Sequence, residues 1–285
     1  PNTDPVAERF RKYNVPTADR VDDVSANVMV FPEVRSVSLA SYRNIRKILW
    51  WLSVDNYYES KALKFPPVTL PDKWAIWKRQ KEINAVFRDP NILHLAQSHY
   101  ALDYLNKRGI PYAEYLADYL GDEFINRGVV YSSANRANLV LYNPLKGHDF
   151  TQKIIRKAPD IPFVPLQDMT PLQLSDLFLK SKCYIDFGSH PGKDRFPRES
   201  AILGNCVITG RRGSAAFHQD VPVPDAYKFS DNERSLPGII AAIKGCFDHY
   251  DDKIEDFEEY RSIIRADRQQ FISDLKRVFQ KTDQP

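Results

Sequence analysis

The sequence predicts an α/β protein in which parallel strands alternate with helices. Two observations support this fold class. In the second half of the chain, short apolar runs alternate with runs whose apolar residues follow a helical period. Pro and Gly stand where several of these helices are expected to begin and end. Because strands that alternate with helices form βαβ units, we expect doubly wound parallel sheets that are covered on both faces.

The second half of the chain carries the clearest alternation. The expected strands are residues 139–143, 161–166, 183–188, 206–210 and a short one at 227–230. The expected helices are residues 148–158, 171–182, 197–205, 235–249 and 253–281. Thr170 is the expected N-cap of the second helix, because Pro171 fits the first helical position.

The first half is less regular. Its expected strands are residues 27–34, 47–56 and 91–98, followed by a helix at 99–109, and a proline-rich stretch at 65–72 interrupts them. Polar residues between 122 and 136 mark a domain boundary. We therefore expect one domain at residues 1–130, a second at 131–252 and a C-terminal helical segment at 253–285.

Composition excludes several classes of protein. The 40 Lys and Arg against 37 Asp and Glu give a net charge of +3, which does not suit a general nucleic-acid binder. Recognition of an anion must therefore be local. The three cysteines lie far apart without metal-ligand spacing, which predicts buried thiols in a reducing compartment. No apolar run approaches the roughly 20 residues that cross a bilayer, so we expect a cytoplasmic protein.

The stretch SHPGKDRFPRESAILGNCVITGRRGS, residues 189–214, follows a strand and leads into a helix. Ligands of open parallel sheets bind beyond the carboxyl ends of the strands, and a helix N-terminus favours a phosphate. Gly192 would allow close backbone approach, while Lys193, Arg195 and Arg198 would add charge-assisted hydrogen bonds. This pattern predicts a phosphate site.

Two further loops are expected at the same sheet edge. Asn143 and Lys146 follow the first strand of the second domain, and Gly213 and Ser214 would offer backbone N–H groups after a later strand. The alternative for Arg211 and Arg212, which precede that turn, is a solvated rim.

Glu199 and His190 allow more than one role. A carboxylate such as Glu199 can hold a ribose diol with two hydrogen bonds beside a diphosphate. The alternative is a structural ion pair between Arg195 and Glu199. His190 is a candidate general base, or else a residue that fixes its loop.

The C-terminal half resembles the nucleotide-binding domain of GT-B-fold glycosyltransferases. The matching motifs are NPLKG, PLQLSDLFLKSK and GKDRFPRESAILGNCVITGRRGS. The resemblance is good over residues 139–229 and reaches 27–109 only in general layout, and the whole chain looks most like bacterial surface-polysaccharide (capsule or O-antigen) transferases. It places Glu199 on the family's ribose-binding glutamate, and Lys146 and Arg195 near its diphosphate-binding basic pair.

The resemblance implies two Rossmann-like domains that face each other across a cleft, with the C-terminal helix packing back on the N-terminal domain. It also implies metal-independent transfer of a sugar from a nucleotide-sugar donor to an acceptor hydroxyl. No metal and no other cofactor are expected, and the chain has no DxD triplet. The acceptor, a glycan or a lipid-linked molecule, would bind the N-terminal domain.

The chain departs from the family pattern at one position. Pro191 stands where retaining members carry a second glutamate, so retention and inversion both stay open. The His190-Pro191 pair also marks some transferases that use CMP-linked Kdo or sialic acid, which is one alternative. A non-catalytic sugar-nucleotide-binding domain is another. A dinucleotide enzyme is disfavoured, because no G-x-G-x-x-G follows a strand.

The first half adds one candidate catalytic residue. Glu33 follows an expected strand and could act as a base or contact the acceptor, although a solvated loop acid is the simpler interpretation. Basic and aromatic residues mix at 42–52 and 73–81, a composition that suits peripheral contact with the inner face of a membrane. The alternative for residues 42–52 is a buried strand.

Overall fold

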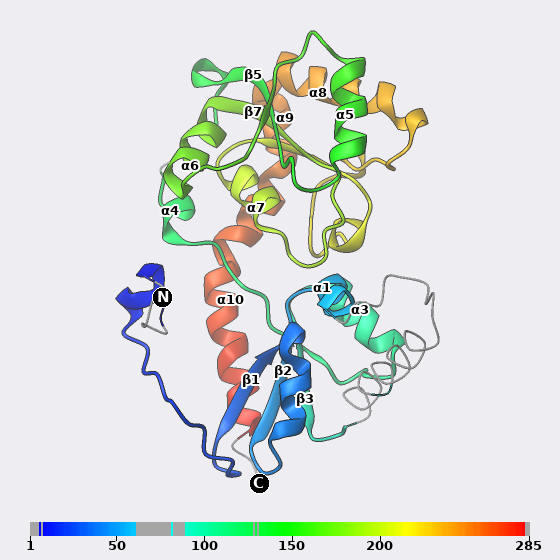
Figure 1. Cartoon of the computed structure of the whole chain (residues 1–285). Helices are drawn as coiled ribbons and strands as arrows, with labels where there is room; N and C mark the ends of the chain where they lie inside the picture. Colours follow the sequence, from blue (N-terminus) through cyan, green and yellow to red (C-terminus); the bar gives the residue numbers. More distant parts are fainter. Residues whose placement is uncertain are drawn as a thin grey trace.

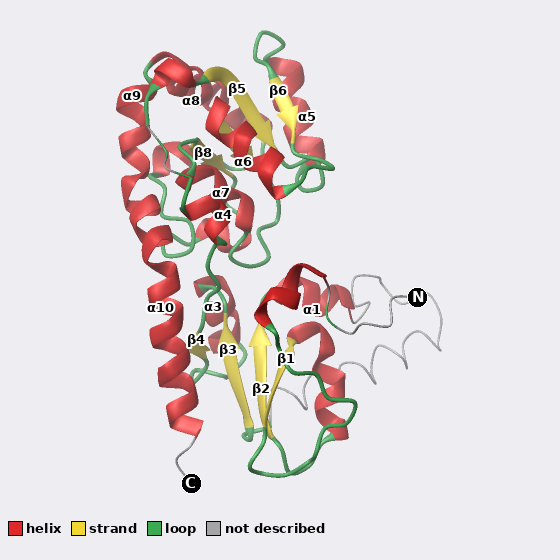
Figure 2. Ribbon diagram, turned by 90° about the vertical axis from the view of Figure 1, so that its left-hand side faces the viewer, coloured by secondary structure: helices red, strands yellow, loops and turns green. Residues whose placement is uncertain are grey.

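The computed structural model describes residues 6, 8–60, 81, 89–127, 129 and 131–282, so the stretch at 65–72 and nearly all of 73–81 lie outside the described residues. The strands of the described part form two four-stranded sheets, and every strand pairing within them is parallel. The predicted α/β class with parallel sheets is therefore confirmed. We name the part built on the first sheet lobe 1 and the part built on the second sheet lobe 2 (Figures 1 and 2).

Lobe 1 has the strand order β1-β2-β3-β4. The strands are β1 (Val28–Pro32), β2 (Arg46–Trp51), β3 (Ile92–Ala96) and β4 (Glu114–Tyr115). The 3₁₀ helix η2 (Glu33–Ser41) follows β1, the helix α1 (Val54–Ser60) follows β2, and the helix α3 (His99–Lys107) follows β3. Residues 42–52 therefore contain a strand, with Trp51 fully buried. The expected strand at 47–56 ends early, because the Ser53 hydroxyl accepts the Asn56 N–H and starts α1.

Lobe 2 has the strand order β6-β5-β7-β8. Its strands are β5 (Ala137–Tyr142), β6 (Phe163–Pro165), β7 (Ser181–Asp186) and β8 (Cys206–Thr209). Its main helices are α5 (His148–Lys157), α6 (Pro171–Lys180), α7 (Arg195–Ile202) and α8 (Leu236–Asp248). Thr170 caps α6 as predicted, in a capping box with Gln173. The expected strand at 227–230 is a single bridge between Thr209 and Lys228.

The C-terminal helix α10 (Glu258–Thr282) runs along both lobes (Figure 1). It contacts α7 in lobe 2. Farther along, Val278 packs with Ile48 and Leu95 of lobe 1. The remaining short helices are η1 (Glu8–Tyr13), α4 (Asp122–Ile125), η3 (Ser133–Asn135), η4 (Gly213–Ala216), η5 (Asp225–Tyr227), η6 (Glu233–Ser235), α9 (Tyr250–Lys253) and η7 (Ile254–Phe257).

Burial explains the apolar runs in the sequence of lobe 2. Every residue of β7 and β8 is buried, which is the pattern of a parallel strand that is covered on both faces. Cys183, Cys206 and Cys246 are free thiols buried in this core, as predicted. No helix in the described part of the chain is long and apolar enough to span a membrane.

The carboxyl ends of the two sheets face each other. Figure 2 shows the strands of lobe 1 pointing toward lobe 2, and β5 and β6 pointing back toward lobe 1. The loops that follow the strands therefore meet between the lobes, which is where open α/β sheets bind ligands.

Candidate functional site

The candidate site is built around one loop, residues 187–194, which connects β7 to α7 and which we name the junction loop. The segment after β8 holds its backbone. Arg212 donates to the carbonyl of Phe187 at 2.7 Å, and the Ser214 N–H donates to the carbonyl of His190 at 2.9 Å. The Ser214 hydroxyl donates to the carbonyl of Gly192 at 2.6 Å. The loop is thus fixed at three carbonyls.

These contacts correct the prediction for Gly213 and Ser214. Ser214 is fully buried, and both of its donors serve the junction loop, so it does not offer a free N–H to a phosphate. A Cβ on Gly213 would lie 2.1 Å from the carbonyl oxygen of His190, and its φ is +56°. Gly213 is needed there for close packing against the loop.

Lys146 lies at the predicted edge, beside the start of α7. Its side chain packs so close to Gly188 that a Cβ added to Gly188 would lie 2.8 Å from the Lys146 Cβ. Its Nζ donates to both carboxylate oxygens of Asp194, at 2.9 and 3.0 Å. Asn143 also lies at this edge, where its side-chain oxygen accepts the Leu145 N–H and shapes the turn. A role for either residue in binding a donor stays a prediction.

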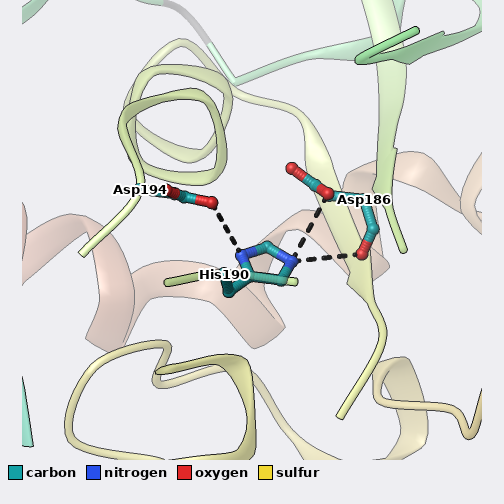
Figure 3. A group of neighbouring side chains, drawn as sticks. All are labelled: Asp186, His190 and Asp194. Carbon is teal, nitrogen blue, oxygen red and sulfur yellow. Dashed lines mark hydrogen bonds and ion pairs between the residues drawn. The ribbon is translucent and has the colours of Figure 1, made fainter. Parts of the chain in front are cut away.

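His190 is fully buried between two carboxylates (Figure 3). Its Nδ1 lies 3.3 Å from Asp194 Oδ2, and its Nε2 lies 3.4 Å from both Oδ1 and the backbone oxygen of Asp186. Burial alone would lower the pKa of His190, but the two aspartates outweigh it and raise that pKa. Both carboxylates therefore favour the protonated ring. Complete burial does not suit a general base that has to meet an acceptor, and the contacts of the ring within its own loop support the alternative, that His190 fixes the loop.

Within the described ranges, one ligand atom each of Asp186, His190 and Asp194 lies within 4.8 Å of the other two, a spacing that could hold a metal ion. The imidazole has one ring nitrogen toward each carboxylate, so a metal ion between the ring and a carboxylate would have to displace any proton held there. Burial would raise the pKa of Asp194, yet His190 and Lys146 lower it, so this acid stays ionised. The absence of a metal requirement stays a prediction.

Arg195 and Glu199 form an ion pair one turn apart on α7, with 2.5 Å between Arg195 Nη2 and Glu199 Oε1. Glu199 is fully buried, and burial raises its pKa against the opposing effect of Arg195. We therefore correct the ribose-binding prediction for Glu199, because its carboxylate is closed to solvent. Lys146 pairs with Asp194 and Arg195 pairs with Glu199, so each of the two cations has an acidic partner of its own, and their convergence on a diphosphate stays a prediction.

Lys193 also differs from its prediction. Its Nζ donates to Asp267 of α10 at 2.8 Å, and its side chain is only 4% exposed. The neighbouring Arg198 is fully buried and donates to Asp118 Oδ1 at 2.8 Å and to the Lys193 carbonyl at 2.9 Å. Lys193 thus holds the junction loop against α10, and Arg198 holds α7 against Asp118. Neither side chain is directed at a phosphate.

Gly192 brings the junction loop directly against lobe 1. A Cβ on Gly192 would lie 2.2 Å from the carbonyl oxygen of Leu52, just after β2. The Lys193 N–H donates to Gln97 Oε1, just after β3, at 3.3 Å. Glu33 follows β1 as predicted, but it is 2% exposed and accepts the Leu52 N–H at 3.0 Å. The interpretation of Glu33 as a solvated loop acid is therefore wrong, and a buried carboxylate that holds the Leu52 N–H does not suit a base or an acceptor contact.

A second lobe contact lies at the N-terminus of α3. Asp220 of lobe 2 accepts the backbone N–H groups of His99 and Tyr100 at 2.8 and 2.9 Å. The N-cap Ser98 accepts the next one, from Ala101. Asp220 is 1% exposed, so the backbone N–H groups at the N-terminus of α3 take the place of water as hydrogen-bond donors to its carboxylate.

Sequence reasoning anticipated one acidic partner of the predicted cations, because the alternative ion pair of Arg195 with Glu199 is formed. It missed the others: Lys146 pairs with Asp194, Lys193 with Asp267 and Arg212 with Asp231. Asp194 stands within the stretch at 189–214 and could have been weighed against Lys146. Asp231 and Asp267 gave no local signal, because only the tertiary fold brings them to the loop.

No family model matches this chain, and no curated protein matches it. Among solved structures, HepE from Anabaena in complex with UDP is similar with a TM-score of 0.57 at 10% identity, over 88% of this chain and 78% of HepE. TarM is similar with a TM-score of 0.58 at 12% identity, over 97% of this chain but 57% of TarM. Such identities show the fold alone. At that level, the predicted resemblance to glycosyltransferases is confirmed.

Proposed function

We propose that the protein is a GT-B-type glycosyltransferase that transfers a sugar from a nucleotide-sugar donor to an acceptor hydroxyl. In this proposal lobe 2, residues 131–252, binds the donor, and lobe 1, residues 1–130, binds a glycan or lipid-linked acceptor. Residues 253–285 tie the two domains together. The observation that carries the proposal is that strand ends of both sheets meet where Lys146 reaches the start of α7. The fold likeness to a UDP complex supports it.

The chemistry follows from the charges at this edge. As the acceptor oxygen bonds to the anomeric carbon, the bond to the diphosphate breaks and the leaving group gains negative charge. Lys146 would stabilise that charge, and Gly188 leaves the room that the Lys146 stem needs to reach the start of α7. Asn143 would line the same edge. We propose that no metal is needed, because the lysine and the helix terminus provide the positive charge.

A specific observation favours a second candidate, a non-catalytic sugar-nucleotide-binding protein. Both predicted catalytic residues, Glu33 and His190, are closed to solvent. A protein of this kind would bind the nucleotide without cleaving the sugar–phosphate bond.

A nucleotide-binding experiment tests the proposal. UDP, GDP, TDP and CMP are titrated by calorimetry in EDTA against the wild type, Lys146→Ala and Lys153→Ala. Lys153 is the matched control, since it is an exposed lysine of α5 that pairs with Glu233. We expect one nucleoside diphosphate to bind, Lys146→Ala to weaken it by about tenfold or more, and Lys153→Ala to leave it unchanged.

The result separates the candidates. If CMP binds in preference to the diphosphates, the CMP-sugar alternative is correct. If no nucleotide binds, or if Lys146→Ala binds as well as the wild type, the proposal is wrong. Release of sugar from the corresponding nucleotide sugar then distinguishes an enzyme from a binding protein.

A further inference from the structure

Asp194 stands at the N-cap of α7, but its side chain does not cap the helix. An aspartate at this position ordinarily accepts an N–H from the first turn. Here no such hydrogen bond is made, and both carboxylate oxygens instead accept from Lys146 Nζ. One of them also lies 3.3 Å from His190 Nδ1. The carboxylate therefore faces two basic side chains.

This carboxylate occupies the place where the proposed function puts a phosphate. Its oxygens neutralise Lys146 beside Gly188, at the carboxyl end of β7 and the start of α7. Two anionic oxygens that face a lysine and a histidine ring are the contacts that a phosphate oxygen pair would make. A phosphate that takes the same two N–H groups of Lys146 has to replace the carboxylate, because the two anions repel each other at that place.

We propose that Asp194 is an internal anion that fills the phosphate site of the empty protein, and that a phosphate-bearing ligand binds by displacing it. The nature of that ligand, a nucleoside diphosphate, rests on the proposed function. The displacement itself needs only an anion with phosphate chemistry.

The same loop connects this site to lobe 1. Gly192 lies two residues before Asp194 and packs on the Leu52 carbonyl, and the Lys193 N–H bonds to Gln97. Because Gly192, Lys193 and Asp194 are consecutive residues of the junction loop, Asp194 cannot move away from Lys146 without shifting these contacts. Displacement of the carboxylate therefore loosens the contact between the lobes, and by linkage the closed lobe contact weakens ligand binding.

The test uses the isosteric variant Asp194→Asn, which removes the charge. Calorimetry measures binding of inorganic pyrophosphate and of UDP to the full chain. We expect Asp194→Asn to bind pyrophosphate about tenfold more tightly than the wild type. The matched control is Asp225→Asn, an 86% exposed partner of Arg211, which should leave binding unchanged. Equal or weaker binding to Asp194→Asn than to the wild type overturns the proposal.

Hydrogen exchange tests the coupling to lobe 1, first in the wild type and then in the variant. Pyrophosphate added to the wild type should speed amide exchange at residues 188–194 and at Leu52–Ser53, and Asp194→Asn should show faster exchange without ligand. Asp194→Ser, which keeps an N-cap residue, replaces Asp194→Asn if the latter does not fold. Slower exchange of Leu52–Ser53 on binding, or no change, contradicts the coupling.

The two ligands separate this inference from the proposed function. If pyrophosphate binds Asp194→Asn more tightly but UDP binds neither protein, the nucleotide function fails and the internal anion stands. If UDP binds the wild type and Asp194→Asn equally, the function stands and the internal anion fails. If neither ligand binds either protein, both are wrong.

Discussion

Replacement of Arg198 by alanine should destabilise the whole protein. Arg198 is fully buried, and its guanidinium donates to Asp118 through the side chain at 2.8 Å and through the carbonyl at 3.3 Å. It also donates to the carbonyls of Lys193 and Asp194, at 2.9 and 3.2 Å. Arg198→Ala removes all of these bonds and opens a cavity between α7 and α10.

The size of the effect follows from what is left unpaired. Loss of one partner of a buried ion pair costs about 3–5 kcal/mol. Asp118 is 36% exposed and can be rehydrated, and Asp267 keeps Lys193, so we expect the lower end of that range. A loss of about 3 kcal/mol lowers the melting temperature of a chain of this size by roughly 5 °C.

Thermal unfolding followed by calorimetry measures this change. The matched control is Arg211→Ala, because Arg211 pairs with the exposed Asp225 and is itself 43% exposed. Such a surface pair contributes about 1 kcal/mol or less. A loss in Arg198→Ala no larger than in Arg211→Ala would refute the argument. Loss of UDP binding without loss of stability would instead return Arg198 to the phosphate site.

Three further outcomes follow from the lobe contacts and the buried charges. Gly192→Ala should separate the lobes and raise the radius of gyration in small-angle scattering, because the added Cβ would meet the Leu52 carbonyl. The control Gly245→Ala, whose Cβ would lie in open space, should leave the radius unchanged, and equal radii for the two variants would contradict the lobe contact. Asp220→Ala leaves two helix N–H groups without their acceptor and should lower the free energy of unfolding in urea by about 2 kcal/mol or more. A change near zero would mean that water replaces the carboxylate. The pKa of His190 is raised above its ordinary 6.5, so its contribution to stability is full below that value and is lost as pH rises through the folded pKa. Unfolding free energy should therefore fall above pH 6.5 and fall less in His190→Asn, which tolerates the φ of +45°; parallel pH profiles would rule this out.

Local patterns in the sequence were enough to predict most of the second sheet. The apolar runs of β7 and β8 are continuous because both strands are covered on both faces, and that burial leaves a direct mark on composition. The Thr170 cap is a contact between near neighbours, so a short motif carries it. Lys146 could be placed because the carboxyl ends of parallel strands share one edge.

The sequence by itself determined the α/β class, the order of strands and helices in lobe 2, and the edge at which Lys146 lies. Only the tertiary structure decided which charges meet. Lys193 was predicted to face a phosphate and instead binds Asp267, 74 residues away, while Glu199 and His190 are closed off inside the protein. The physical reason is that helix period and strand burial act between neighbours in the chain. The partner of a buried charge depends on which distant segment the fold packs against it.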